Sequence, residues 1–337
     1  MEIDIILEPD LKPDEIRELG ILAESYGFRA LWTECYVRAR DPFMTLVPLA
    51  EATDRIKLGV MVVGPWEQHP IKTLNTLLTL NEYSHGRACL VVSAGAEWCG
   101  VIGKEPERRV RAAREMVEIL IGASTNDVFN YEGELYKVRR GFNASWATDE
   151  RPLIYVGAGK EQMIRMSARV ADGFMMSDMP LQLVDEAIGY ARDALAAGDR
   201  GSDDFRISNF WAWHIKENRE EAFREARREM MLRAWLDPEV FAAFLSPEDL
   251  QIMIDKTPAF LKAYRDRSGN IEDVPESIVN QMIENITATG DMSDLDREID
   301  RLRRFRDAGL TEIGLRVHDD PASTIRTIGE LVLPALQ

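Results

Sequence analysis

The segment of the sequence most suited to holding a ligand is a glycine-rich string of four residues, Gly157-Ala158-Gly159-Lys160. An apolar run over residues 153–156 precedes it, and a helical pattern over residues 161–170 follows it. Glycines let the backbone approach a bound molecule, and the free N–H groups at the start of a helix favour an anion. Lys160 would add a positive charge. The string predicts a phosphate site, although the same string also serves as an ordinary turn between a strand and a helix.

Residues after the other apolar runs include carboxylates and tryptophans, and they form neither a hydrolytic nor a metal-binding set. They are Glu8, Glu34, Trp66, Glu97 and Trp98. This set contains no Ser–His–Asp order, the four histidines lack HExxH and HxH spacing, and the three cysteines form no CxxC pair. We therefore expect no metal site, and a bound organic cofactor is the simpler source of the chemistry.

The elements that must position these residues are short apolar runs alternating with long amphipathic stretches. The runs cover residues 3–7, 30–33, 56–63, 88–93, 153–156, 173–177, 207–215 and 312–317, and a helical pattern follows each. Eight βα units with right-handed crossovers predict a closed (β/α)8 TIM barrel. An open, doubly wound sheet is the alternative, but the first strand lacks the GxGxxG turn that a Rossmann domain needs.

A helix-rich block over residues 225–289 interrupts this alternation after the seventh strand, and residues 129–138 resemble a small hairpin. An insertion at that point lies at the C-terminal face of a barrel, where active sites form. The block is either a lid over the substrate or a dimerisation element. We predict one domain over residues 1–337, and a homodimer that uses the helices at 70–83 and 105–121.

Composition excludes several classes of protein. Of the 337 residues, 45% are hydrophobic and 29% charged, which is typical of a globular chain, and the net charge is −17. A chain this acidic repels phosphate backbones and anionic membranes, so we expect no nucleic-acid partner. No apolar run is long enough for a membrane span, and the start lacks the features of a signal peptide. Together with the cysteine usage, this predicts a cytoplasmic protein that acts on a small molecule.

An ordered set of short strings resembles the bacterial luciferase-like superfamily, particularly the deazaflavin-dependent branch typified by methylenetetrahydromethanopterin reductase. No single string is decisive, but the set is collinear over nearly the whole chain. The strings are Gly27-Phe28, Trp32-Thr33-Glu34, Asp41-Pro42, Lys57-Leu58-Gly59, Gly64-Pro65, His69-Pro70, Gly86-Arg87, Val156-Gly157-Ala158-Gly159, Ala171-Asp172-Gly173 and Gly309-Leu310-Thr311.

The resemblance implies coenzyme F420, a 5-deazaflavin with a ribityl phosphate and an acidic lactyl-glutamyl tail, with FMN as the alternative cofactor. It implies that Gly157, Ala158, Gly159 and Lys160 hold the phosphate, and that a non-prolyl cis peptide between Met61 and Val62 backs the ring. Arg38 and Arg40 are candidates for contact with the tail, or are simply a solvated pair in a loop. The family's glycine-rich segment ending in a carboxylate corresponds to Ala94, Gly95, Ala96 and Glu97.

The same resemblance identifies Glu97, Glu34 and Cys35 as catalytic candidates. Glu8, Trp66 and Trp98 are candidate substrate contacts because they follow strands, Glu8 only if the end of the first strand is shifted outward. Glu97 is the candidate general acid or electrostatic partner, because a carboxylate beside an apolar ring can have a raised pKa. The two tryptophans would exclude water or stack on the substrate, or else pack in the core.

The chain also departs from the reductase pattern. Cys35 replaces the histidine of an acidic–histidine pair, and Ile6 occupies the place of a first-strand glutamate. Both changes put a pterin substrate in doubt. The sequence therefore predicts an F420-dependent oxidoreductase that transfers hydride between the deazaflavin C5 and an organic, pterin-like or other, substrate. The alternatives are an FMN-dependent monooxygenase and a deazaflavin-binding protein without turnover.

Overall fold

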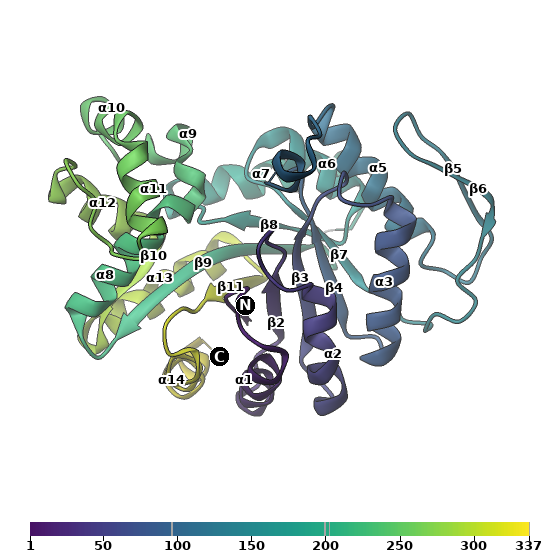
Figure 1. Cartoon of the computed structure of the whole chain (residues 1–337), viewed down its shortest axis with the longest axis horizontal. Helices are drawn as coiled ribbons and strands as arrows, with labels where there is room; N and C mark the ends of the chain where they lie inside the picture. The colour runs from purple at the N-terminus through teal and green to yellow at the C-terminus, as the bar shows by residue number, and fades with distance from the viewer. Residues whose placement is uncertain (96, 199, 202, 337) are drawn as a thin grey trace.

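Eight parallel strands form a closed barrel in the computed structural model, which describes residues 1–95, 97–198, 200–201 and 203–336. Pairing of β8 with β9 closes the ring, so the open-sheet alternative is excluded and the predicted (β/α)8 barrel is confirmed (Figure 1). In order around the ring, the strands are β1 (Glu2–Ile6), β2 (Ala30–Glu34), β3 (Lys57–Val63), β4 (Ala88–Val92), β7 (Leu153–Gly157), β8 (Gly173–Ser177), β9 (Arg206–Lys216) and β11 (Glu312–Arg316).

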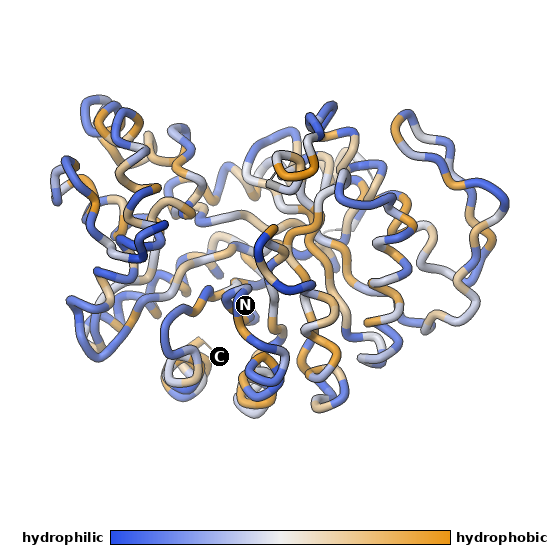
Figure 2. Tube along the Cα trace, in the orientation of Figure 1, coloured by the Kyte–Doolittle hydropathy of each residue, from blue (hydrophilic) through white to orange (hydrophobic). Residues whose placement is uncertain are grey.

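Amphipathic helices pack around the barrel and bury one face each. On α13 (Leu295–Ala308), Ile299, Leu302 and Phe305 face the core, at the spacing that puts residues on one side of a helix. The strands at the centre are mostly hydrophobic, whereas many peripheral connections are hydrophilic (Figure 2). The other covering helices are α1 (Pro13–Tyr26), α2 (Pro42–Ala52), α3 (Pro70–Tyr83), α5 (Arg109–Gly122), α6 (Glu161–Val170), α7 (Leu181–Ala197), α8 (Arg219–Glu229) and α14 (Pro321–Thr327), which runs on through η3 (Ile328–Val332) into α15 (Leu333–Leu336).

Polar groups hold the barrel interior together below the site. Asp4 on β1 accepts hydrogen bonds from Trp32 Nε1 at 2.8 Å and from the guanidinium of Arg29. Arg29 also pairs with Glu312 at 3.1 Å. Because these charges are buried but paired, they satisfy one another in the low dielectric of the interior. Above them, apolar side chains including Ile6, Val91 and Phe210 fill the barrel.

Two excursions leave the barrel on opposite sides of the view in Figure 1. One is a hairpin of β5 (Phe129–Glu132) and β6 (Lys137–Phe142), which confirms the hairpin expected from the sequence and extends its second strand. The other is the insertion after α8, formed by η1 (Met230–Leu236), α9 (Pro238–Phe241), α10 (Pro247–Asp255), α11 (Thr257–Arg265) and α12 (Glu276–Ile286).

The insertion has an apolar core of its own, with Met230, Phe241, Phe260 and Met282 fully buried. It ends in a ninth parallel strand, β10 (Thr287–Asp291), which pairs with β9. The last three residues of the block expected to be helical, 287–289, therefore belong to a strand. The short η2 (Met292–Asp294) then leads into α13. No helix in the described part of the chain is long and apolar enough to cross a membrane.

Candidate functional site

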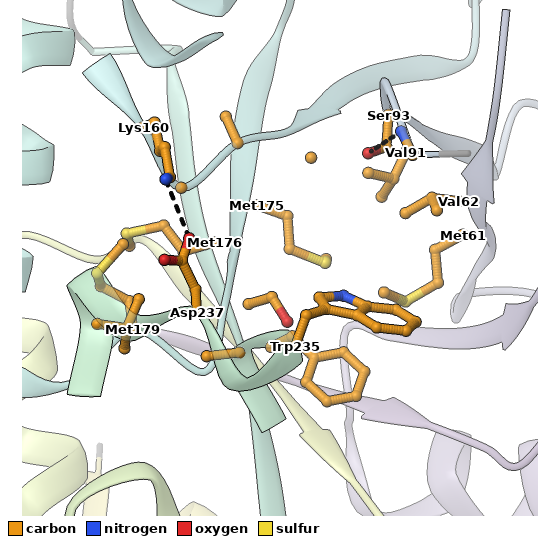
Figure 3. A pocket seen from close by; sticks show the side chains of 18 of the residues that line it. Met61, Val62, Val91, Ser93, Lys160, Met175, Met176, Met179, Trp235 and Asp237 are labelled. Atoms are coloured by element: carbon orange, nitrogen blue, oxygen red, sulfur yellow. Dashed lines mark hydrogen bonds and ion pairs between the residues drawn. The ribbon is translucent and has the colours of Figure 1, made fainter. Parts of the chain in front are cut away.

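A large pocket opens at the C-terminal mouth of the barrel, with a volume of about 1110 Å³. Residues of β2, β3, β4, β7, β8 and β9 contribute to its lining, and so do seven residues of the insertion between positions 232 and 240. Met61 and Val62 lie on one side of this pocket, and Lys160 with Asp237 on the other (Figure 3). The pocket therefore has the place and the size that barrel enzymes use for a cofactor and a substrate.

The β3 side of the pocket is apolar and irregular in backbone. The peptide bond between Met61 and Val62 is cis, as the family resemblance implied, and the pairing of β3 with β4 shifts register between Met61 and Val63. Val91, Met175 and other apolar side chains extend this surface. This side of the pocket therefore presents an apolar surface to a ligand.

The glycine-rich string after β7 lines the same pocket from the other side. A Cβ added at Gly159 would come no closer to described atoms than 3.9 Å, at Met179 Cε, which is an ordinary van der Waals contact, so the position has room for a Cβ. Gly157 differs, because its added Cβ would lie 3.1 Å from Ser93 Cβ. Lys160 is the N-cap of α6 and makes no side-chain cap, which leaves the first N–H groups of the helix open to an anion.

Lys160 itself is engaged by two carboxylates of the insertion. Its Nζ lies 3.1 Å from Asp237 Oδ2 and 2.9 Å from Glu239 Oε2. Hydrogen bonds from the ammonium to Glu239 and Asp237 raise the pKa of Lys160, so the lysine stays charged. Lys160, which the sequence predicted to bind a phosphate, thus has two acidic neighbours from a distant part of the sequence.

Glu34 and Cys35 enter the pocket from the end of β2. Glu34 is buried and forms an ion pair with Arg316 at the end of β11. Arg316 is buried too and also donates to the Leu7 carbonyl at 3.0 Å; burial lowers its pKa to about 10. Cys35 Sγ lies 3.9 Å from Glu67 Oε2, and its backbone N–H donates to the Met61 carbonyl at 2.6 Å. Glu34 and Cys35 therefore lie beside the register shift of β3 between Met61 and Val63, which we call the β3 bulge.

The segment after β4 supplies some of the residues predicted there. Gly95 and Trp98 line the pocket, and Trp98 belongs to α4 (Glu97–Ile102). Ala94 instead packs against the core behind the pocket. Ala96 lies outside the described residues. Glu97 is the first residue of α4, and its side chain is likewise outside what the structure describes.

Two predicted substrate contacts lie away from the pocket lining. Trp66 is buried in a small apolar cluster with Cys99 and Ala112, which is the core-packing alternative. Glu8 follows the end of β1, where its Oε1 lies 3.1 Å from His318 Nδ1. Burial raises the pKa of Glu8. Neither side chain reaches the pocket, because each already has partners in the folded chain.

Glu8, Glu229 and His318 form one cluster in which a metal could bind, with ligand atoms within 4.8 Å of one another. The two carboxylates already face arginines: Arg228 Nε lies 2.6 Å from Glu229 Oε1, and Arg316 approaches Glu8 at 4.0 Å. Guanidinium groups supply the positive charge that a cation would otherwise supply. We therefore keep the sequence-based expectation of no metal site.

Sequence reasoning missed the pocket residues that come from the insertion. Arg233 is buried, donates to Asp178 Oδ1 at 3.1 Å, and lies 5.0 Å from the centre of the Phe210 ring. Ala234, Trp235 and Leu236 follow in the left-handed region, with φ of 44°, 53° and 50°. Trp235 is 62% exposed although it lines the pocket.

The position of the block after the seventh strand was the available signal, and it correctly pointed to the barrel mouth. Nothing in the local pattern identified which of its residues would reach the pocket. Seven residues between positions 232 and 240 line the pocket, so the insertion contributes to the site, and the choice between a lid and a dimerisation element stays open.

The fold and pocket define a (β/α)8-barrel protein with a ligand site at the carboxyl ends of its strands. The luciferase-like monooxygenase family model matches residues 3–312. The chain belongs to this family, which confirms the resemblance seen in the sequence.

The chain is similar in sequence or fold to several proteins, including ones solved with F420 or FMN. The 5,10-methylenetetrahydromethanopterin reductase of Archaeoglobus fulgidus is 27% identical over the full length of both chains. An F420-dependent secondary alcohol dehydrogenase, solved with an F420-acetone adduct, has a TM-score of 0.78 at 17% identity, and the match covers 100% of this chain and 99% of that one. A riboflavin lyase solved with modified FMN has a TM-score of 0.73 at 14% identity, covering 100% of this chain and 91% of its own.

Proposed function

We propose that the chain is an F420-dependent oxidoreductase that transfers a hydride between C5 of the deazaflavin and an organic substrate in this pocket. The observation that carries the proposal is that the β3 bulge and the Gly157–Lys160 loop line one cavity of about 1110 Å³. One side offers an apolar wall for a ring and the other an anion site for a phosphate. The similarity to the reductase of Archaeoglobus fulgidus supports the choice of cofactor.

The pocket fits the ring and phosphate of such a cofactor. The lack of a Cβ at Gly159 would let a ligand come close to the backbone, and the start of α6 next to it has no side-chain cap, so its first N–H groups are available to an anion. Gly157, Ala158 and Gly159 would bind the phosphate, while Met61 and Val62 would support the ring. When bound, the deazaflavin supplies a hydride at C5.

The side chains of this protein would orient the reactants and manage charge. Trp98 and Trp235 line the pocket and would exclude water from the ring and substrate. Glu97, at the start of α4, is the proposed proton donor or electrostatic partner. Glu34 is held by Arg316, so it would act as a fixed charge-compensated group rather than an exposed anion.

The first strand supplies no carboxylate to this pocket. Ile6 is buried among apolar residues inside the barrel, and Glu8 faces His318. The wall that a substrate meets includes Met175, Met176 and Phe210. We therefore propose an organic substrate with an apolar face, and the pterin-specific carboxylate of the reductase pattern plays no part in the proposal.

Spectroscopic titration tests the cofactor. Coenzyme F420 is expected to bind and FMN is not. Binding of FMN alone would overturn the proposal in favour of an FMN-dependent monooxygenase. Binding of F420 with no hydride transfer to any of a panel of aldehydes, ketones, imines and activated alkenes would instead favour a deazaflavin-binding protein without turnover.

The predicted homodimer and cytoplasmic location stay predictions of the sequence. The dimer would use α3 and α5, and light scattering at micromolar concentration checks the mass.

A further inference from the structure

Most of the charged residues that line the pocket proposed to hold an anionic cofactor are acids. Among the described lining residues, six carry carboxylates and two carry cations. The cations are Lys160 and Arg233. The carboxylates are Glu34, Glu67, Glu161, Glu186, Asp237 and Glu239.

Both cations are already neutralised by the protein. Lys160 contacts Asp237 and Glu239 at 3.1 and 2.9 Å, and Arg233 donates to the fully buried Asp178. Of the two arginines that the sequence suggested for an acidic tail, Arg40 donates to the Asp10 carbonyl at 2.6 Å, and neither lines the pocket. The described lining therefore offers little charge to balance a tail of several carboxylates.

The two carboxylates on Lys160 stand at the solvent edge of the pocket. Glu239 is 76% exposed in its side chain, Asp237 is 29% exposed, and Lys160 is 60% exposed. The glycine-rich loop beside them is the proposed phosphate site, so any group that continues from the phosphate toward solvent starts next to these acids. Two like charges about 4 Å apart in water change an affinity by roughly fivefold, and salt screens the effect.

We propose that Asp237 and Glu239 select the form of the cofactor, favouring a deazaflavin whose phosphate carries few or no glutamyl carboxylates over one with a long oligoglutamate tail. This inference rests on the proposed function. The phosphate itself is still accepted, because the open N–H groups of the loop and of α6 hold it without requiring Lys160 to be free. At the rim, the added carboxylates of a long tail meet Asp237 and Glu239, whose two negative charges exceed the single positive charge of Lys160.

The effect of salt on cofactor affinity distinguishes a pocket that repels a long acidic tail from one that attracts it. Where a site attracts a polyanion, raising the ionic strength weakens binding because it screens the attraction. Where the site repels the tail, raising the ionic strength removes a penalty. For this chain, the preference for the short form over the long form is therefore expected to shrink as salt is added.

The test is a titration of the full chain with three deazaflavins. The first is the phosphate-free deazaflavin riboside, the second carries phospholactate without glutamate, and the third carries a long oligoglutamate tail. Wild type is expected to bind the second about fivefold or more tightly than the third at low salt. Glu239→Gln and Asp237→Asn should each tighten the long-tailed form most, by roughly three- to tenfold, and leave the phosphate-free riboside unchanged.

Glu248→Gln is the matched control, because Glu248 is an exposed acid of α10 outside the pocket and its loss changes net charge equally. It should leave all three affinities as they are. Affinity that rises with tail length and falls with salt would overturn the inference while leaving the proposed function intact. If none of the three deazaflavins binds, the proposed function itself fails, and the selection proposal fails with it.

Discussion

Glu34 at the end of β2 and Arg316 at the end of β11 form a buried ion pair across the barrel mouth, with β1 between the two strands. Glu34 lines the pocket, whereas Arg316 lies behind it. The pair therefore places a carboxylate at the ligand site without leaving its charge uncompensated. It also makes the pocket wall depend on a contact between opposite ends of the sequence.

Replacing Arg316 with Met should strongly destabilise the protein. Removing one partner of a buried pair leaves the other charge uncompensated, which typically costs about 3–5 kcal/mol in the free energy of unfolding. The double variant Glu34→Gln, Arg316→Met should recover a large part of that loss, because no buried charge remains. Chemical denaturation of the single and double variants measures both. Equal destabilisation of the two would show that the charge of Glu34 is not the cause.

A side chain at position 159 should block the cofactor without harming the fold. A Cβ at Gly159 meets Met179 Cε at 3.9 Å without a clash, so Gly159→Val should change thermal stability little while F420 affinity falls by roughly tenfold or more. Gly189→Ala is the control, since an added Cβ at Gly189 in α7 meets no described atom within 4 Å and Gly189 lies outside the pocket lining. Unchanged F420 affinity in Gly159→Val would move the phosphate to another part of the pocket.

The sequence predicted the features of this fold that depend on short-range patterns. Alternating strands and helices set the barrel, and a glycine-rich string between a strand and a helix identified a loop that does line the pocket. The family resemblance added the cis peptide between Met61 and Val62, which no propensity would suggest.

The sequence could not show which side chains find other partners in the folded chain. Glu8 and Trp66 follow strands, as pocket residues do, but His318 and the Cys99 cluster hold them elsewhere. The contact of Lys160 with Glu239 joins a barrel loop to a four-residue helix of the insertion, and it depends on how the whole insertion packs. Such long-range contacts leave no periodic signal.

Glu97→Gln should slow hydride transfer while leaving cofactor binding nearly unchanged. The substitution keeps the size of the side chain and removes both its charge and its proton, so kcat should fall by roughly 10²–10⁴-fold if Glu97 is the general acid. Glu105→Gln, at an exposed position beyond α4, is the control. Near-normal kcat in Glu97→Gln would remove Glu97 from the mechanism, and lost F420 binding would make it a positioning residue.

His318 should make the stability of the protein fall as the pH drops below neutral. Burial is the main cause that lowers the pKa of His318 well below 6.5. Nearby basic side chains lower it further, namely His214, Arg316, Arg233 and Arg228. The Nδ1 atom of His318 lies 3.1 Å from Glu8 Oε1. In the unfolded chain His318 binds a proton as the pH falls through about 6.5, whereas in the folded chain it stays neutral. The free energy of unfolding is therefore highest above that pH and declines below it, by up to about 1.4 kcal/mol per pH unit. His318→Gln removes the titrating imidazole, so the free energy of unfolding measured in urea should fall less between about pH 7 and pH 5. His85→Asn, at an exposed position with φ of 52°, should keep the wild-type slope. A slope that is the same in wild type and His318→Gln would mean that His318 is protonated in the folded protein.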